Sequence, residues 1–161
     1  MTDTALDAFC RDNQITLSAT LLGYVPDNVT PRDKRWPHFS WRVTITRGDH
    51  SHTTDYRTGI GHAQPLPDHY RRDLAEPARR EAWFNRHSTP VVPTVASVLH
   101  SLLSDAQTGL DTFDEYCSSF GLDTDSRKAL DTYLACQTIG VVIRRLLGEL
   151  YQPACEAAQD Y

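Results

Sequence analysis

The sequence has no run of about 18 apolar residues, the length that a helix needs to cross a membrane. Its first residues, MTDTALDAF, contain two aspartates and no basic residue, so they do not resemble a secretory signal peptide. It also contains no CxxC pair, no glycine-rich phosphate loop, no Gly-x-Ser-x-Gly motif and no internal repeat. These absences predict a protein of a reducing cytoplasm that has neither a membrane span nor a familiar cofactor motif.

The composition indicates a folded, acidic chain. Its 161 residues are 40% hydrophobic and 23% charged, which is enough apolar surface for one core. The net charge of -5 argues against direct binding to nucleic acid and suits the binding of a basic protein surface. Four cysteines lie far apart in the sequence and are interpreted as buried free thiols: Cys10, Cys117, Cys136 and Cys155.

The N-terminal part of the chain predicts one helix and one strand. Residues 3–12 carry apolar side chains at spacings of three and four, with Asp3 or Thr4 as the N-cap. Residues 14–22 alternate apolar and polar side chains, and residues 23–37 hold the glycine and prolines of a loop. The side chains expected to point inward from this strand are Ile15, Leu17, Ala19 and Leu21.

A β-hairpin is predicted next. Residues 38–47 alternate aromatic and β-branched side chains, Gly48 and Asp49 form a turn, and residues 51–57 return as the second arm. Together with residues 14–22, the hairpin completes a three-stranded antiparallel meander.

A long insert follows that hairpin, whose second arm is expected to end at residues 59–62. Residues 63–92 combine prolines, arginines and aromatic side chains, with one short helix predicted over 76–86. Connections of this length are usually functional in a small domain. Charge mixed with aromatic surface is typical of protein-binding hot spots, for a partner or for a homodimer, although it also occurs on salt-bridged surfaces. The candidate contact residues here are Arg71, Arg72, Arg79, Trp83 and Phe84.

The second half of the chain has helical periodicity. Three helices are predicted over residues 93–106, 112–120 and 124–147, the last of them capped by Thr124 or Asp125. In the third helix, Gly140 would let a neighbouring helix approach closely.

Strands followed by helices predict an α+β fold, in which the meander packs against the N-terminal helix and a C-terminal group of three helices. We expect a single domain over residues 1–150 and a C-terminal tail over residues 151–161.

The helical half is strongly acidic, with seven carboxylates and only two basic side chains between residues 104 and 131. One interpretation is a solvated surface whose acidic residues complement the starts of helices. The other is a patch that meets a basic groove, as a competitor of nucleic acid would. The candidate contact residues of this block are Asp111, Asp114, Glu115 and Asp123.

Histidines offer two further interpretations. His50 and His52 would lie on one side of a strand, but no carboxylate or cysteine accompanies them at a familiar ligand spacing, so no metal or cofactor is predicted. Two H-x-T tripeptides match the paired motif of two-histidine phosphoesterases, in which one histidine is the base and the other the acid. Tripeptides of this kind also arise by chance. The residues of this alternative are His52, Thr54, His87 and Thr89.

Four segments carry a resemblance to a known family. They are TDYRTGIGH at 54–62, PTVASVLHSLLSDA at 93–106, TFDEYCSSFGLDTDSRKALDTYLAC at 112–136 and RRLLG at 144–148. Over residues 53–148 the chain resembles a family of small phage-encoded accessory proteins, most specifically over residues 113–129. The insert at 63–92 departs from the family, whose members join the strand and the helix more directly.

The resemblance implies a phage source and an action against host functions, including CRISPR-Cas defence. We therefore expect an anti-CRISPR-like, non-catalytic inhibitor in the cytoplasm of the infected bacterial host. Its partner would be a bacterial defence protein, such as a Cas protein or effector complex. The alternatives are the phosphoesterase described above and a structural or assembly factor of the virion.

Overall fold

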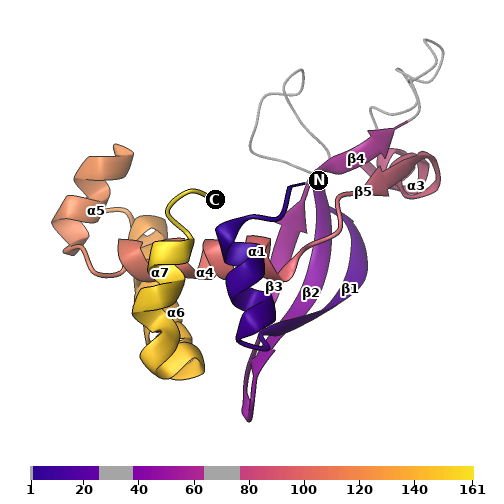
Figure 1. The fold of residues 1–161 in the computed structure, drawn as a ribbon. Helices are drawn as coiled ribbons and strands as arrows, with labels where there is room; N and C mark the ends of the chain where they lie inside the picture. Colours follow the sequence, from indigo (N-terminus) through magenta and orange to yellow (C-terminus); the bar gives the residue numbers. More distant parts are fainter. Residues whose placement is uncertain (1, 26–37, 64–76) are drawn as a thin grey trace. The chain divides into compact units, whose positions relative to one another are not determined.

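The computed structural model describes residues 2–25, 38–63 and 77–161, and it confirms the α+β class (Figure 1). A three-stranded antiparallel sheet has the strand order β1-β2-β3, which is the predicted meander. A second sheet pairs β4 with β5, and no helix of the described residues has the length and hydropathy to cross a membrane. The first elements are α1 (Ala5–Asp12), β1 (Thr16–Val25), β2 (His38–Arg47), β3 (His50–Thr58), β4 (Ile60–Ala63), α3 (Pro77–His87) and β5 (Ser88–Pro90). They are followed by α4 (Val95–Thr108), α5 (Phe113–Phe120), α6 (Arg127–Leu147), η2 (Gly148–Leu150) and α7 (Tyr151–Ala157).

The chain forms two compact units. The helical unit comprises Met1–Leu17, Ile45–His52 and Thr94–Tyr161, and the strand unit comprises Ser18–Thr44 and Thr53–Pro93. A single domain over residues 1–150 stays a prediction.

The C-terminal residues differ from the tail that was expected. Residues 151–161 begin with α7, which packs against α1 and buries Ala154 completely. Pro153 is compatible with this helix because it lies in the first turn, where no intrahelical amide bond is lost.

The strand prediction holds for β2 and fails for most of β1. The four side chains Phe39, Trp41, Val43 and Ile45 are all buried, as the alternation predicts. In β1, Ile15 is buried just before the strand, Leu17 is half-buried, and both Ala19 and Leu21 are exposed. Tyr24 is the next side chain of β1 that is buried, so the alternation of burial that begins at Ile15 is lost along the strand.

The ends of the insert are held together by backbone pairing. Residues 59–62 do not end a strand as predicted, because β4 begins at Ile60 and pairs antiparallel with β5, with Ile60 opposite Pro90. One residue further, the amide of Val91 donates to the carbonyl of Gly59 at 2.9 Å. The predicted helix of the insert is present as α3.

The helical unit is built on α4 and α6, which lie side by side, while α1 packs against α4 and α7 (Figure 1). At Gly140, α4 packs against α6, but a Cβ there would lie 3.7 Å from the Cα of Ala106, an ordinary contact that does not require glycine. Most of the apolar side chains at helical spacing in α4 are buried, namely Val98, Leu99, Leu102, Leu103 and Ala106. Val95 is only half-buried, and Ala96 is buried as well.

The predicted cap of α6 is wrong. Neither Thr124 nor Asp125 caps the helix, which begins at Arg127, and the Oγ of Ser126 accepts the amide of Ala129 at 3.2 Å. Instead, the backbone amide of Asp125 donates to Oδ1 of Asp123 at 2.9 Å, so the chain turns before the helix begins. Each residue type can cap a helix, and this local turn decides which one does.

We therefore expect Ser126→Ala to lower the free energy of unfolding by about 1 kcal/mol, because it leaves an amide of the first turn without its acceptor. Asp125→Ala should cost much less, since this side chain is exposed and makes no cap. Urea denaturation of the two variants measures the difference. An equal loss in both variants, or a larger loss for Asp125→Ala, would show that Ser126 is not the cap of α6.

Candidate functional site

An aromatic cluster fixes α5 to the first turns of α6. The rings of Tyr116 and Tyr133 are buried with their centroids 5.5 Å apart, and Phe113 lies 5.5 Å from Tyr133. The hydroxyl of Tyr133 donates to the carbonyl of Asp111 at 2.6 Å, which ties the segment before α5 to the same cluster. These contacts hold α5 against α6, while other side chains of α5 stay exposed.

Phe120 has the helical spacing to lie on the same side of α5 as Phe113 and Tyr116, but it is not buried. Its ring lies 5.0 Å from that of Tyr116, yet 60% of the residue is exposed. The helix ends at Gly121, whose φ of 64° turns the chain away, so no further turn covers the ring. Leu122, which follows, is also exposed. A glycine directly after an aromatic residue is the sequence signal that could have identified this exposed position.

The four acidic candidates are all exposed, but two of them have structural roles. Glu115 accepts the backbone amide of Thr112 at 2.9 Å in a capping box, and Asp123 holds the turn before α6. The side chains of Asp111 and Asp114 make no hydrogen bond or ion pair within the described residues. Two of the four candidates therefore stabilise local structure at helix starts, and Asp111 and Asp114 are the carboxylates available to a partner.

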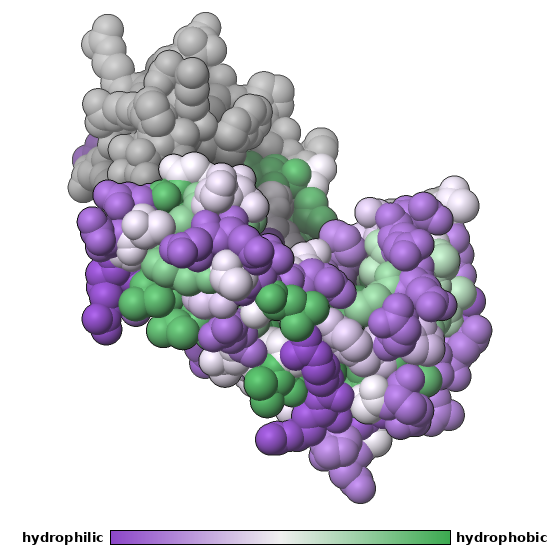
Figure 2. Space-filling view, turned by 90° about the vertical axis from the view of Figure 1, so that its left-hand side faces the viewer, coloured by the Kyte–Doolittle hydropathy of each residue, from purple (hydrophilic) through white to green (hydrophobic). Residues whose placement is uncertain are grey.

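Asp114 and Asp123 both act on the thiol of Cys117. Burial raises the pKa of Cys117, and the negative charges of Asp114 and Asp123 raise that pKa further. Asp114 lies in the first turn of α5 and Asp123 follows the end of the helix, and both are close enough to this sulfur to act on it. We call Asp114, Phe120, Leu122 and Asp123 the α5 face. On the side of the molecule seen in Figure 2, hydrophobic residues interrupt a mainly hydrophilic surface in several separate places.

The candidate residues of the insert are only partly described. Arg71 and Arg72 lie outside the described residues, as does the side chain of Phe84, while Arg79 is exposed. Trp83 is buried, with its ring stacked on that of His87 at 4.8 Å. Such burial favours a structural role for the indole within the strand unit.

The residues of the phosphoesterase alternative are divided between the two units. His52 belongs to the helical unit, whereas Thr54, His87 and Thr89 belong to the strand unit. The Nδ1 of His87 lies 3.0 Å from the carbonyl oxygen of Trp83, a local contact that orients the ring. Within the described residues, no group of three or more His, Cys, Asp and Glu side chains is arranged to hold a metal ion.

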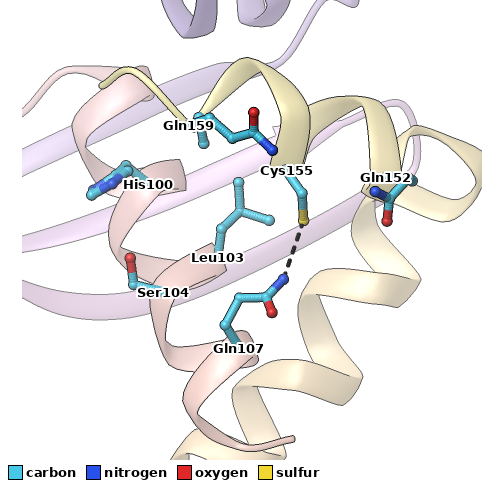
Figure 3. A pocket seen from close by; sticks show the side chains of 8 residues that line it. His100, Leu103, Ser104, Gln107, Gln152, Cys155 and Gln159 are labelled. Carbon is cyan, nitrogen blue, oxygen red and sulfur yellow. Dashed lines mark hydrogen bonds between the residues drawn. The ribbon is translucent and has the colours of Figure 1, made fainter.

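A cavity of about 380 Å³ lies between α4 and the C-terminal residues (Figure 3). Nε2 of Gln107 donates to Sγ of Cys155 at 3.6 Å, and the ring of His100 lies 4.9 Å from that of Tyr161. Among the described residues that line the cavity, none is an Asp, Glu, Lys or Arg, so it offers hydrogen bonds without a fixed charge. Its lining is His100, Leu103, Ser104, Gln107, Gln152, Cys155, Ala158 and Gln159.

The cysteines are free thiols as predicted, but Cys155 is only half-buried. Burial raises the pKa of Cys10 to about 11, and it also raises the pKa of Cys117 and of Cys136. These three thiols are therefore protonated and inaccessible near neutral pH.

We expect Cys155 to be the one thiol of the native protein that reacts rapidly with a disulfide reagent. All four thiols should react in denaturant. Cys155→Ser should abolish the rapid phase, whereas Cys136→Ser should leave it unchanged. A rapid phase that survives in Cys155→Ser would show that one of the buried thiols is accessible.

Comparison with protein-family models, with curated proteins and with solved structures finds no match for this chain. The resemblance to phage accessory proteins therefore stays a prediction. The function is argued below from the geometry of the α5 face.

Proposed function

We propose that this protein is a non-catalytic binding protein whose α5 face attaches to a basic surface of a protein partner. The observation that carries the proposal is Phe120, an exposed ring supported from beneath by the buried Tyr116. Aromatic side chains of this kind are frequent among binding hot spots, because they bury much area at little cost in conformational entropy.

The charge around the ring sets the character of the partner. Asp123 directly follows the exposed Leu122, Asp114 is exposed in the first turn of the helix that ends with Phe120, and the chain as a whole has a net charge of -5. An apolar centre with an acidic border complements a basic surface that has an apolar pocket. Proteins that bind nucleic acid have basic surfaces of this kind, so the chain would compete with nucleic acid for them.

The resemblance of the sequence supplies the biological setting of the proposal. The partner is a bacterial defence protein, such as a Cas protein or an effector complex, and the bound chain is its inhibitor in the cytoplasm of the infected cell. An acidic protein that covers a nucleic-acid groove would inhibit without catalysis.

The test compares the wild type with Phe120→Ser and with a matched control, Val141→Ser. Val141 is 58% exposed on α6 and lies eight residues beyond Tyr133, roughly 12 Å along the helix. We expect the wild type and the control to capture a partner from host lysate and to restore phage plating on a strain with the matching defence system. Phe120→Ser should fail in both assays. Equal activity of Phe120→Ser and the wild type would exclude the α5 face.

The virion alternative has its own outcome in the same experiment. If the protein is found in purified particles and no variant alters plating on defended strains, the chain is a structural or assembly factor.

A further inference from the structure

A second cavity, of about 160 Å³, lies between the start of β3 and the last turns of α6. Three consecutive residues of β3 line one side of it, and α6 lines the other. Its polar lining combines two imidazoles, a hydroxyl and a guanidinium, and no carboxylate of the described residues lines it. The lining residues are His50, Ser51, His52, Val142, Arg145 and Leu146.

The imidazole of His52 carries an unsatisfied donor or acceptor. Its Nε2 is buried, and no described residue forms a hydrogen bond with it. Buried polar atoms are almost always paired, because leaving one without a partner is costly. The same side chain lines the cavity, so a turn of its ring would offer this nitrogen to a group bound there.

The charges around this cavity favour an anion. Arg145 makes no ion pair within the described residues. The end of α6 would ordinarily repel an anion, but Nη1 of Arg47 donates to the carbonyls of Leu146 and Leu147 at 3.3 and 2.9 Å and offsets that negative end. Arg47 also pairs with Glu149 at 3.1 Å, so this carboxylate is already neutralised.

Two other charged residues, Asp49 and Arg144, are close in sequence to the residues that line the cavity. Asp49 is exposed in the turn before β3, and it is the carboxylate that could reduce the affinity for an anion. Arg144 lies over the ring of Tyr151 at 5.1 Å from its centroid and adds a positive charge to the same end of α6. Near the cavity, three arginines outnumber two carboxylates, so the local charge is positive in a chain that is acidic overall. The residues counted are Arg47, Arg144, Arg145, Asp49 and Glu149.

We propose that the cavity formed by His50, Ser51, His52 and Arg145 binds a phosphate group. A tetrahedral oxyanion presents several acceptors to several donors, and a guanidinium matches two of its oxygens at once. The cavity has room for several water molecules, at about 30 Å³ each, and hence for one such ion. The group would be inorganic phosphate or the terminal phosphate of a monoester, and this site is independent of the α5 face.

The first test is titration calorimetry of the full chain with sodium sulfate at constant ionic strength, because sulfate keeps two charges at about pH 5.5 and at about pH 8. Histidine side chains ordinarily change charge within this interval. We expect saturable binding at the lower pH that weakens about tenfold at the higher pH. No saturable binding at either pH would overturn the proposal.

The second test locates the site. Arg145→Gln should weaken sulfate binding about tenfold or more, whereas Arg127→Gln, which removes the same charge from the other end of α6, should change it less than about twofold. His52→Gln supplies an independent variant that keeps a polar side chain, and it should also weaken binding. Circular dichroism verifies that each variant is folded. Equal affinity in Arg145→Gln and Arg127→Gln would show that sulfate binds elsewhere and would overturn the proposal.

The third test separates the two sources of the group. Inorganic phosphate and phosphoserine are titrated in parallel at the lower pH. Tighter binding of inorganic phosphate assigns the site to the free ion, and tighter binding of phosphoserine assigns it to a monoester. Failure of both to displace sulfate would overturn the proposal.

Discussion

Replacing Gly109 by alanine should lower the free energy of unfolding by about 1–3 kcal/mol, the usual cost of forcing a methyl group into a packed interior. A Cβ at this position would lie 2.9 Å from three backbone atoms of α6, namely the carbonyl carbon and oxygen of Cys136 and the nitrogen of Gln137. Backbone atoms cannot rotate aside, so α4 and α6 would have to separate. The loss would come from this contact alone, because Gly109 has a φ of -68°, which alanine adopts without strain.

Gly140→Ala is the matched control for that prediction. Its new Cβ would lie 3.0 Å from Nη1 of Arg144, the far end of a flexible side chain, and at least 3.7 Å from Ala106. Alanine is favoured over glycine inside a helix by about 1 kcal/mol, so this variant should be neutral or slightly more stable. Urea denaturation of both variants gives the comparison. If Gly109→Ala were as stable as Gly140→Ala, the close approach of α4 to α6 at Gly109 would be disproved.

These two glycines show how far the sequence specifies the packing. Gly140 interrupts a helical apolar stripe, which made it a visible candidate for a close approach, but its contact with Ala106 on α4 is an ordinary one. Gly109 follows α4 and looks like an ordinary helix end, so nothing local reveals that it touches the backbone of α6. Contacts between residues distant in sequence depend on the tertiary fold, and periodicity carries no information about them.

The same distinction applies to the strands and caps. In β2, a strand between two neighbours, alternation predicts every buried side chain, whereas in the edge strand β1 it fails at Ala19 and Leu21. The cap of α6 was misplaced by one residue because Asp125 and Ser126 have similar propensities, and only the turn formed by Asp123 separates them.

The sequence revealed only part of the candidate sites. The acidic block is evident in the sequence, yet the division between Glu115, which caps α5, and Asp114, which makes no local hydrogen bond or ion pair among the described residues, is a matter of geometry. The phosphate cavity could not be predicted, because Arg145 is more than ninety residues from His50 and His52 and meets them only in the folded helical unit.

The second large effect concerns binding to the proposed basic partner, and it should separate the two components of the α5 face. Phe120→Ala should accelerate dissociation about 30-fold, which corresponds to the loss of a typical hot spot of about 2 kcal/mol. Association should change little, because the charges that steer the encounter remain. Surface plasmon resonance with the captured partner measures both rates.

Removing the charges of Asp114 and Asp123 should instead slow association and change dissociation little. The double variant Asp114→Asn and Asp123→Asn removes two charges and keeps the side-chain oxygen of residue 123 that accepts the amide of Asp125, so stability should be nearly unchanged. Association should slow about tenfold at low salt, and the difference from the wild type should disappear at about 1 M salt, where charges are screened over roughly 3 Å. Glu156→Gln, an exposed carboxylate of α7, is the control and should bind like the wild type. If the double variant associates as fast as this control at every salt concentration, Asp114 and Asp123 do not steer the partner, and the acidic block only solvates and caps its helices.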